Sequence, residues 1–250
     1  MTTASQAALF GALARRRALK IISGLQNFDL QSVLKVTRAA QEGGATWVDI
    51  AASPELVQQV RAQIELPICV SAVDPQQLAA AVQAGADMAE IGNYDSFYPS
   101  GRIFSAAEVL DLTRQTRSLL PRTLLSVTVP HTLPLDQQAE LAEKLEDLGA
   151  DLIQTEGGTS AEPRHGGSLG LIEKAAPTLA AAYEISRVVS LPVICASGLS
   201  AVTVPLAIAA GASGVGVGRA VSRLQDEVAM VAQVRALREA LSESRVSALV

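Results

Sequence analysis

Four charged residues interrupt apolar segments of this chain and are the first candidates for chemistry. Lys20, Asp49, Glu90 and Glu156 each lie in a segment with the composition of a buried strand. Strand side chains alternate between two faces, and a helix-covered face cannot hold a charge cheaply, so we expect all four to point into the interior that the strands enclose. An amine and three carboxylates in a low-dielectric interior must pair, shift their pKa values or hold a ligand. The pattern predicts a ring of interior charges.

This ring has two interpretations. In the catalytic one, Lys20 is an electrostatic clamp, a proton donor or a Schiff-base amine, with Asp49, Glu90 or Glu156 as the base. In the structural one, the charges form an ion-pair network beneath the site. Glu156 is the best candidate for a catalytic carboxylate, because it ends its strand beside a Gly-Gly step. His131, which follows another strand, either transfers protons near neutral pH or is a solvated, loop-capping residue.

Two successive strand ends near the C-terminus offer a site for an anion. Ser197 and Gly198 end one strand, and Gly216, Gly218 and Arg219 end the next. Glycine lets backbone N–H groups approach a ligand closely, and the ends of the last two strands of an eight-stranded barrel often bind phosphate. We expect these five residues to bind the phosphate of a ligand or cofactor. The alternative is that the glycines only permit close packing of the strands.

The elements that must position these residues repeat one unit, which is a short strand, a small-residue turn and a helix. This alternation is typical of a parallel sheet covered by helices. Eight units predict an α/β fold, a closed (β/α)8 TIM barrel in a single domain over residues 1–250, with a short N-terminal helix. The predicted strands are 18–24, 45–51, 67–73, 86–92, 123–129, 150–156, 192–198 and 212–218, and the predicted helices are 29–42, 54–64, 75–84, 105–120, 135–148, 177–190, 201–210 and 222–243.

Glycines indicate where the helices end, and two long loops indicate where a site is expected. Several helices are predicted to end in a Gly-Ala step, where glycine is a natural cap: Gly44-Ala45, Gly85-Ala86, Gly149-Ala150 and Gly211-Ala212. Two connections, 93–104 and 157–176, are long and leave the C-terminal ends of strands, the face that carries active sites in this fold. The first holds four aromatic residues that form either a stacking wall for a flavin or base, or the loop's own core: Tyr94, Phe97, Tyr98 and Phe104.

Composition excludes several classes of function. A net charge of -5 gives no basic surface for nucleic acid, and no apolar run is long enough to span a membrane. Cys69 and Cys195 fall in separate predicted strands, which favours reduced thiols in a cytoplasmic protein. The two histidines show no ligand spacing, so no metal site is predicted. Trp47 is expected to pack between strands and helices, and the oligomeric state is left open.

Seven motifs give the chain a specific resemblance. It resembles the uncharacterised hypothetical chloroplast reading frame family, number twenty-three, of cyanobacteria and algal plastids. That resemblance implies an aldolase-type TIM barrel from a photosynthetic lineage, located in the plastid stroma in algal relatives, with no established activity. The motifs are Ala18-Leu-Lys-Ile-Ile-Ser-Gly24, Val48-Asp-Ile-Ala51, Leu66-Pro-Ile-Cys-Val-Ser71, Glu90-Ile-Gly-Asn93, Ser126-Val-Thr-Val-Pro-His-Thr132, Gln154-Thr-Glu156 and Ile194-Cys-Ala-Ser-Gly-Leu199.

A broader similarity to phosphate-binding barrels rests on the last two strand ends. Thiazole synthase, sugar-phosphate epimerases and flavin-dependent nitronate oxidases share this feature. Three functions follow as hypotheses. The first is an enzyme that acts on a small phosphorylated metabolite by acid–base chemistry. The alternatives are an oxidoreductase with flavin mononucleotide (FMN) as its cofactor, and a non-catalytic metabolite sensor or partner-binding protein.

Overall fold

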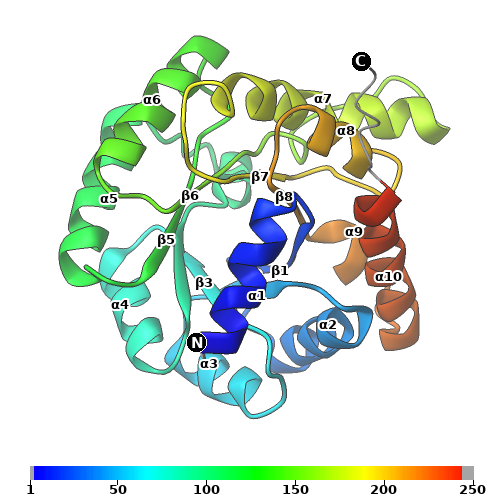
Figure 1. Ribbon diagram of the computed structural model, residues 1–250, viewed down its shortest axis with the longest axis horizontal. Helices are drawn as coiled ribbons and strands as arrows, with labels where there is room; N and C mark the ends of the chain where they lie inside the picture. The colour runs from blue at the N-terminus through cyan, green and yellow to red at the C-terminus, as the bar shows by residue number, and fades with distance from the viewer. Residues whose placement is uncertain (1–2, 244–250) are drawn as a thin grey trace.

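Eight parallel strands close into a barrel in the computed structural model, which describes residues 3–243 (Figure 1). Each strand pairs with the next, and β1 pairs with β8. This confirms the predicted (β/α)8 fold; residues 1–2 and 244–250 of the predicted domain lie outside the described residues. The strands are β1 (Ala18–Gly24), β2 (Trp47–Ala51), β3 (Ile68–Ala72), β4 (Met88–Ile91), β5 (Leu124–Thr128), β6 (Leu152–Gln154), β7 (Val193–Ala196) and β8 (Gly214–Val217).

Helices surround the barrel, and most of them follow the predicted ranges. Two differ: α7 begins at Gly167 rather than near residue 177, and a separate short helix, α9, precedes α10. The helices are α1 (Thr3–Ala14), α2 (Leu30–Gly43), α3 (Pro54–Arg61), α4 (Pro75–Gln83), α5 (Ala106–Leu119), α6 (Leu135–Asp147), α7 (Gly167–Ile185), α8 (Val204–Ala209), α9 (Arg219–Ser222) and α10 (Glu227–Glu243), with 3-10 turns η1 (Tyr94–Ser96) and η2 (Tyr98–Ser100).

Local signals explain where these helices begin and end. Asp29 starts α2 by accepting the N–H of Ser32 at 2.7 Å, and Asp74 accepts the N–H of Gln76 at 2.8 Å at the start of α4. The glycines of all four predicted Gly-Ala steps have positive φ, the conformation that ends a helix at no steric cost: Gly44, Gly85, Gly149 and Gly211. These turns return the chain directly to the next strand.

The N-terminal helix α1 closes the end of the barrel at which the strands begin. In Figure 1 it crosses the centre of the ring of strands. Leu9 is fully buried and packs on the lowest inward-facing side chains of the strands: Ala18, Trp47, Cys69, Met88, Leu152 and Ile194. Trp47 is therefore inside the barrel rather than between strands and helices as predicted. Because it lies two residues before Asp49 on the same strand, it shares the inward face.

Truncation of the side chain that α1 buries deepest tests this closure. We expect Leu9→Ala to lower the free energy of unfolding by about 2–5 kcal/mol, because it leaves a cavity among fixed barrel side chains. Phe10→Ala removes a neighbouring side chain that is 42% exposed and should cost less than about 1 kcal/mol. Urea unfolding monitored by circular dichroism measures both. Equal losses in the two variants would contradict a plugging role for Leu9.

A buried network of polar side chains, here called the lysine network, forms the next layer of the interior. Its members are Lys20, Asp49, Ser71, Glu90 and Gln154, each about 1% exposed. The Lys20 ammonium donates to Glu90 Oε2 at 2.7 Å and to Gln154 Oε1 at 2.9 Å, and lies 3.1 Å from Asp49 Oδ2. Two of these contacts are hydrogen bonds, and the third, with Asp49, is an ion pair. The inward orientation predicted for Lys20, Asp49 and Glu90 is confirmed.

The charges around Lys20 keep it protonated. Burial alone would lower the pKa of Lys20, but the carboxylates of Asp49 and Glu90 outweigh it and hold that pKa above its ordinary value. Burial also raises the pKa of Glu90, against the opposing effect of Lys20. A Schiff-base amine must lose its proton and reach a substrate. The geometry thus favours the structural interpretation for Lys20.

Removal of the lysine charge should destabilise the barrel. Lys20→Met leaves Asp49 and Glu90 buried without their cation, and we expect a loss of about 3–5 kcal/mol in the free energy of unfolding. Lys144→Met is the matched control, since Lys144 forms an exposed pair with Glu140 within one helix, and its loss should cost no more than about 0.5 kcal/mol. Denaturant titration of both variants measures the difference, and a Lys20→Met protein as stable as Lys144→Met would refute this account.

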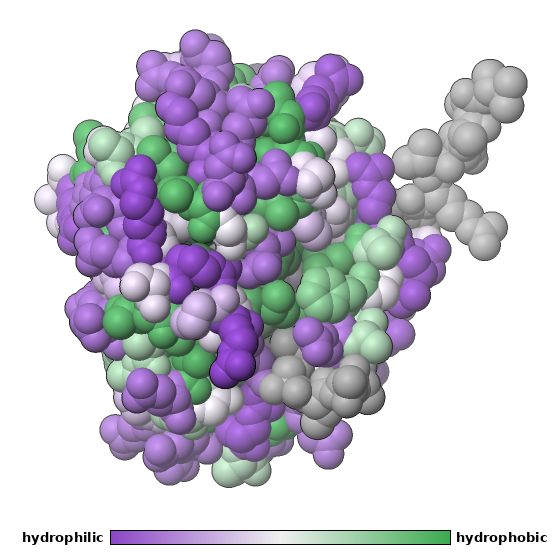
Figure 2. Space-filling model, turned by 60° about the vertical axis from the view of Figure 1, so that its left-hand side comes forward, coloured by the Kyte–Doolittle hydropathy of each residue, from purple (hydrophilic) through white to green (hydrophobic). Residues whose placement is uncertain are grey.

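The outer surface is mixed in character. On the face shown in Figure 2, hydrophilic residues predominate and hydrophobic ones are interspersed among them. Among residues 3–243, no helix combines the length and the apolar character needed to cross a bilayer.

Candidate functional site

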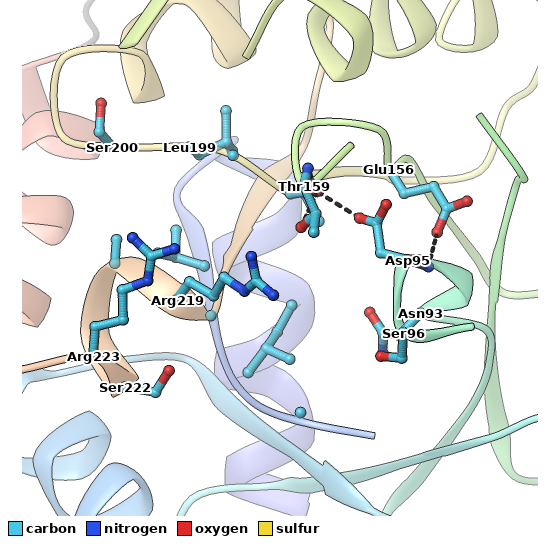
Figure 3. Close-up of a pocket in the computed structure, with 18 of the residues that line it drawn as sticks. Asn93, Asp95, Ser96, Glu156, Thr159, Leu199, Ser200, Arg219, Ser222 and Arg223 are labelled. Carbon is cyan, nitrogen blue, oxygen red and sulfur yellow. Dashed lines mark hydrogen bonds between the residues drawn. The ribbon is translucent and has the colours of Figure 1, made fainter. Parts of the chain in front are cut away.

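A cavity of about 640 Å³ opens at the C-terminal ends of the strands. The ends of β1, β6, β7 and β8 line it, together with the loops after β4 and β6 and parts of α7 and α9 (Figure 3). This is the face on which active sites occur in barrels of this kind, and the volume is in the range of small-molecule sites. The cavity therefore provides the frame in which the predicted site residues can be located.

Two arginines form one side of the cavity, here called the cationic side. Arg219 and Arg223 lie four residues apart at the start and just past the end of α9, so they project from the same face of that turn (Figure 3). Within residues 3–243, neither guanidinium forms an ion pair or a hydrogen bond. Ser222 and Ser200 also line the cavity. Arg223 was missed by the sequence analysis, although its spacing from Arg219 was a usable signal.

The predicted phosphate-binding residues divide into two groups. Ser197, Gly198, Gly218 and Arg219 line the cavity. Gly216 is not among the lining residues; it lies lower in the barrel, where an added Cβ would be 2.9 Å from the Cβ of Ala196. For Gly216, the structure therefore favours the close-packing alternative. Its role as a direct ligand stays an untested prediction.

The Ser197-Gly198 turn is also held by protein contacts. Ser197 has a φ of 76°, and its hydroxyl donates to Asp95 Oδ2 at 2.6 Å while accepting the N–H of Thr159 at 2.7 Å. Gly198 has a φ of 74°, and an added Cβ would come within 2.8 Å of the Cα of Gly158. The serine hydroxyl is thus directed toward a carboxylate, and glycine is needed where the two loops touch.

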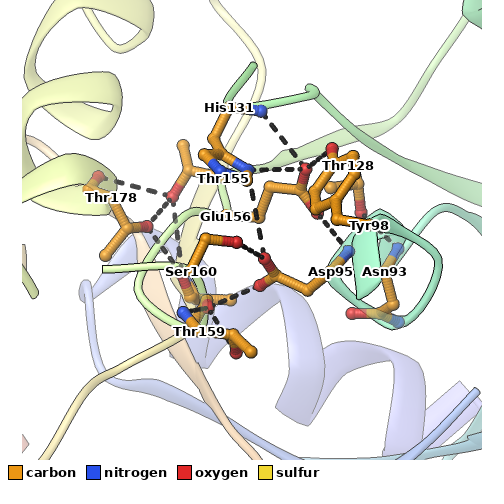
Figure 4. Close-up of polar contacts among 12 residues, drawn as sticks. Asn93, Asp95, Tyr98, Thr128, His131, Thr155, Glu156, Thr159, Ser160 and Thr178 are labelled. Carbon is orange, nitrogen blue, oxygen red and sulfur yellow. Dashed lines mark hydrogen bonds and ion pairs between the residues drawn. The ribbon is translucent and has the colours of Figure 1, made fainter. Parts of the chain in front are cut away.

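Glu156 is the centre of the opposite side of the cavity. Its side chain is 3% exposed and accepts hydrogen bonds from the Tyr98 hydroxyl, from the Asp95 N–H at 3.2 Å and from the His131 N–H at 3.2 Å (Figure 4). The Nδ1 atom of His131 lies 3.3 Å from Glu156 Oε1. The structure thus brings the two predicted acid–base residues, Glu156 and His131, into contact. We call Asp95, His131 and Glu156 the acidic cluster.

Two residues of the acidic cluster, Glu156 and His131, have shifted pKa values. Burial raises the pKa of Glu156, and the hydrogen bond from His131 partly opposes this. The hydrogen bond to Glu156 raises the pKa of His131, against the lowering effect of burial. A proton shared between these two residues is therefore stabilised at the edge of the cavity.

Asp95 and Tyr98 belong to the site but were not predicted as partners of Glu156. Asp95 lies in η1, with Oδ1 3.9 Å from His131 Nδ1 and 3.3 Å from the Ser160 hydroxyl. Tyr98 follows in η2 and also packs edge-on against the His131 ring, with 4.9 Å between ring centroids. Both belong to a loop identified as long and functional, but their partners come from distant loops. Nothing in the spacing along the chain showed these contacts.

The other aromatic residues of that loop form a small core of their own. Tyr94 and Phe104 are fully buried, with ring centroids 4.4 Å apart, and Phe97 lies 5.4 Å from Phe104. Arg102 stacks over Phe104 at 4.4 Å. The loop-core alternative is thus correct for these three rings, while Tyr98 contributes its hydroxyl to Glu156.

The predicted ring of four charges is in fact two separate groups. Among the described residues, Lys20 pairs with Asp49 and Glu90, whereas Glu156 pairs with His131. Gln154 separates the groups, because strand β6 places it one layer below Glu156 on the inward face. Gln154 was missed, although its position two residues before Glu156 predicts the same face. Inclusion of Glu156 in the ring was therefore wrong.

The loop after β6 is shorter than predicted and is held against α7. Lys174 donates to the backbone carbonyls of Thr159 at 3.0 Å and Ala161 at 2.6 Å. Farther out, His165 Nδ1 lies 2.6 Å from Glu173 Oε1. The second histidine thus pairs on an exposed surface, away from the cavity lining.

Comparison with known proteins gives the family and the fold. The model of the family described as "Protein of unknown function (DUF561)" matches residues 5–247. An "Uncharacterized protein ycf23" from Cyanophora paradoxa is 46% identical over 224 residues, which cover 88% of this chain and 90% of that protein. The resemblance predicted from the motifs is confirmed.

Solved structures share the barrel. Tryptophan synthase subunit alpha from Legionella pneumophila str. Paris has a TM-score of 0.66 and 14% identity, over 97% of this chain and 100% of that one. 3-Hexulose-6-phosphate synthase has a TM-score of 0.63 and 16% identity, over 89% of this chain and 99% of that one. At such identities the likeness shows the aldolase-type TIM barrel fold alone. By sequence, the chain belongs to the DUF561 family of proteins of unknown function and is a relative of ycf23.

Proposed function

We propose that this protein is an enzyme that binds a small phosphorylated metabolite in the cavity and carries out acid–base chemistry on it. One observation carries this proposal. Two guanidinium groups that form no ion pair within residues 3–243 and a buried carboxylate cluster occupy opposite sides of one cavity of about 640 Å³ (Figure 3). This division of charge gives a ligand one anionic end and one reactive end. It suits a phosphate monoester of modest size.

The cationic side is the better place for the phosphate. Guanidinium groups bind phosphate through paired, charge-assisted hydrogen bonds, and the hydroxyls of Ser200 and Ser222 lie in the same lining. The opposite side would repel it, because Asp95 and Glu156 both line the cavity there. We therefore place the phosphate beside Arg219 and Arg223, near the predicted Gly218 and farther from the Ser197 hydroxyl.

The acidic side then faces the carbon skeleton of the ligand. Glu156 is held by three donors and contacts His131, so the carboxylate has a fixed direction. Apolar side chains such as Ile22, Leu199 and Val217 also line the cavity. A fixed, nearly buried carboxylate is suited to taking a proton from a ligand or returning one.

Other features support this class of function. The fold is shared with 3-hexulose-6-phosphate synthase, a protein named for a phosphorylated compound. The net charge of -5 favours a small-molecule ligand over nucleic acid. We also infer a cytoplasmic location, with the plastid stroma as its counterpart in algal relatives. The two free, buried cysteines support a reducing compartment.

The FMN alternative receives less support from the cavity. Among the described residues, 3–243, the cavity lining includes no aromatic side chain on which an isoalloxazine ring could stack, since Tyr94, Phe97 and Phe104 pack on one another. A metabolite sensor would use the same phosphate side without turnover.

Ligand-induced stabilisation tests the phosphate side. A panel of short-chain sugar phosphates and the matching unphosphorylated sugars is screened by thermal shift, and a phosphorylated ligand at 100 times its dissociation constant should add about 2.7 kcal/mol. We expect Arg219→Ala and Arg223→Ala each to weaken that ligand about tenfold or more. Arg114→Ala, an exposed arginine on α5, is the matched control and should bind as the wild type does. Unphosphorylated sugars that stabilise equally well would refute the phosphate assignment.

Substitution of the buried carboxylate tests the chemistry. Once a ligand is found, Glu156→Gln should bind it within about threefold while turnover falls about 100-fold or more, because the amide cannot accept a proton. Binding is measured by calorimetry and turnover by NMR of the ligand. A wild-type protein that binds the ligand without converting it would favour the sensor. Unchanged turnover in Glu156→Gln would remove Glu156 from the mechanism.

A further inference from the structure

Three side chains from three successive loops converge on the acidic side of the cavity. His131 Nδ1 lies 3.3 Å from Glu156 Oε1 and 3.9 Å from Asp95 Oδ1, and one ligand atom of each residue lies within 4.8 Å of the others (Figure 4). Two atoms that each bind one ion at about 2.1 Å with a tetrahedral angle are about 3.4 Å apart. The spacing in the acidic cluster is therefore close to that around a bound metal ion.

Outer contacts hold the carboxylates in the orientation that such an ion needs. Ser197 donates to Asp95 Oδ2 at 2.6 Å, while Asp95 Oδ1 faces His131. The Asp95 N–H donates to Glu156 Oε2 at 3.2 Å, and the Tyr98 hydroxyl supports Oε1. Metal-ligating carboxylates are commonly fixed by hydrogen bonds of this kind.

The charges of the cluster are out of balance. Among the ion pairs of residues 3–243, His131 is the cationic partner of both Asp95 and Glu156. One imidazolium offsets only one of the two carboxylates. The side chains of Asp95 and Glu156 are only 14% and 3% exposed, so the negative charge left over is poorly solvated. A divalent cation would offset both carboxylates. The cavity also gives the ion a path from solvent, because Asp95 and Glu156 line it.

We propose that Asp95, His131 and Glu156 bind one divalent first-row transition-metal ion of the Mn²⁺ or Zn²⁺ type. An imidazole nitrogen with two carboxylate oxygens suits such ions, whereas Mg²⁺ and Ca²⁺ prefer oxygen ligands alone. Three protein ligands leave positions open toward the cavity. The spacing of the histidines along the chain predicts no metal site, because each of these three ligands comes from a different loop.

This site goes beyond the proposed function and does not require it. The acid–base role proposed for Glu156 belongs to the ion-free state. With an ion bound, Glu156 would hold the ion, and the ion would polarise an oxygen of whatever ligand enters the cavity. Without an ion, the same atoms share the proton of His131. Direct binding of the metal alone distinguishes the two states.

Metal titration of the full chain tests the site. Chelator-treated protein is titrated with Zn²⁺ and with Mn²⁺ by isothermal titration calorimetry, and we expect one ion per chain. Asp95→Asn and His131→Ala should each weaken binding about tenfold or more. His165→Ala is the matched control, since His165 forms an exposed pair with Glu173 and offers an adventitious zinc site. Its binding of the specific ion should be unchanged.

The outcomes are distinct. Circular dichroism establishes that each variant is folded, and His131→Gln replaces His131→Ala if the smaller side chain unfolds the protein. The proposal is overturned if neither ion binds saturably, if binding survives Asp95→Asn or the His131 substitution, or if only His165→Ala loses it. Because no organic ligand is present in this titration, its failure would leave the phosphate assignment to its own thermal-shift test.

Discussion

The site depends on the contacts that the buried Lys20 ammonium makes with Glu90, Asp49 and Gln154. A lysine buried at the centre of a barrel is stable only if its charge is paired and its N–H groups find acceptors. Glu90 and Gln154 accept hydrogen bonds from it, and Asp49 forms a second ion pair with it. The same acceptors are then fixed in position by the lysine. Gln154 uses its amide group to reach Glu90 at 2.8 Å and Asn93 at 3.2 Å, and both Gln154 and Asn93 line the floor of the cavity.

Asn93 connects the lysine network to the loop that carries part of the acidic cluster. Its amide contacts Asp49 at 3.2 Å, Ser71 at 3.1 Å and Glu90 at 3.1 Å, and its backbone adopts a left-handed conformation with a φ of 62°. Such a conformation in a residue other than glycine persists where surrounding contacts hold it. The turn that begins there carries Asp95 and Tyr98 over Glu156. The lysine network thus supports the acidic cluster from below, and its member Gln154 reaches the cavity lining.

The fold followed from the sequence because it depends on local signals. Alternation of strands and helices and the capping glycines act over a few residues, and each is visible in one segment. The alternation of strand side chains between two faces placed Lys20, Asp49 and Glu90 correctly in the interior. The same rule would have found Gln154 and the inward position of Trp47. Glu156 was assigned to the wrong group, because this alternation gives the face on which a side chain lies but not its height in the barrel.

The site was less predictable because its contacts join loops that no local signal relates. Asp95 meets His131 and Ser197 only after β4, β5 and β7 have closed into one ring. Strand order nevertheless explains the polarity of the cavity. The loops after the consecutive strands β4, β5 and β6 supply Asp95, His131 and Glu156, and the end of β8 supplies Arg219 and Arg223. Since neighbours in the chain are neighbours in the barrel, acidic and cationic residues that are grouped along the sequence must form opposing sides of the same cavity.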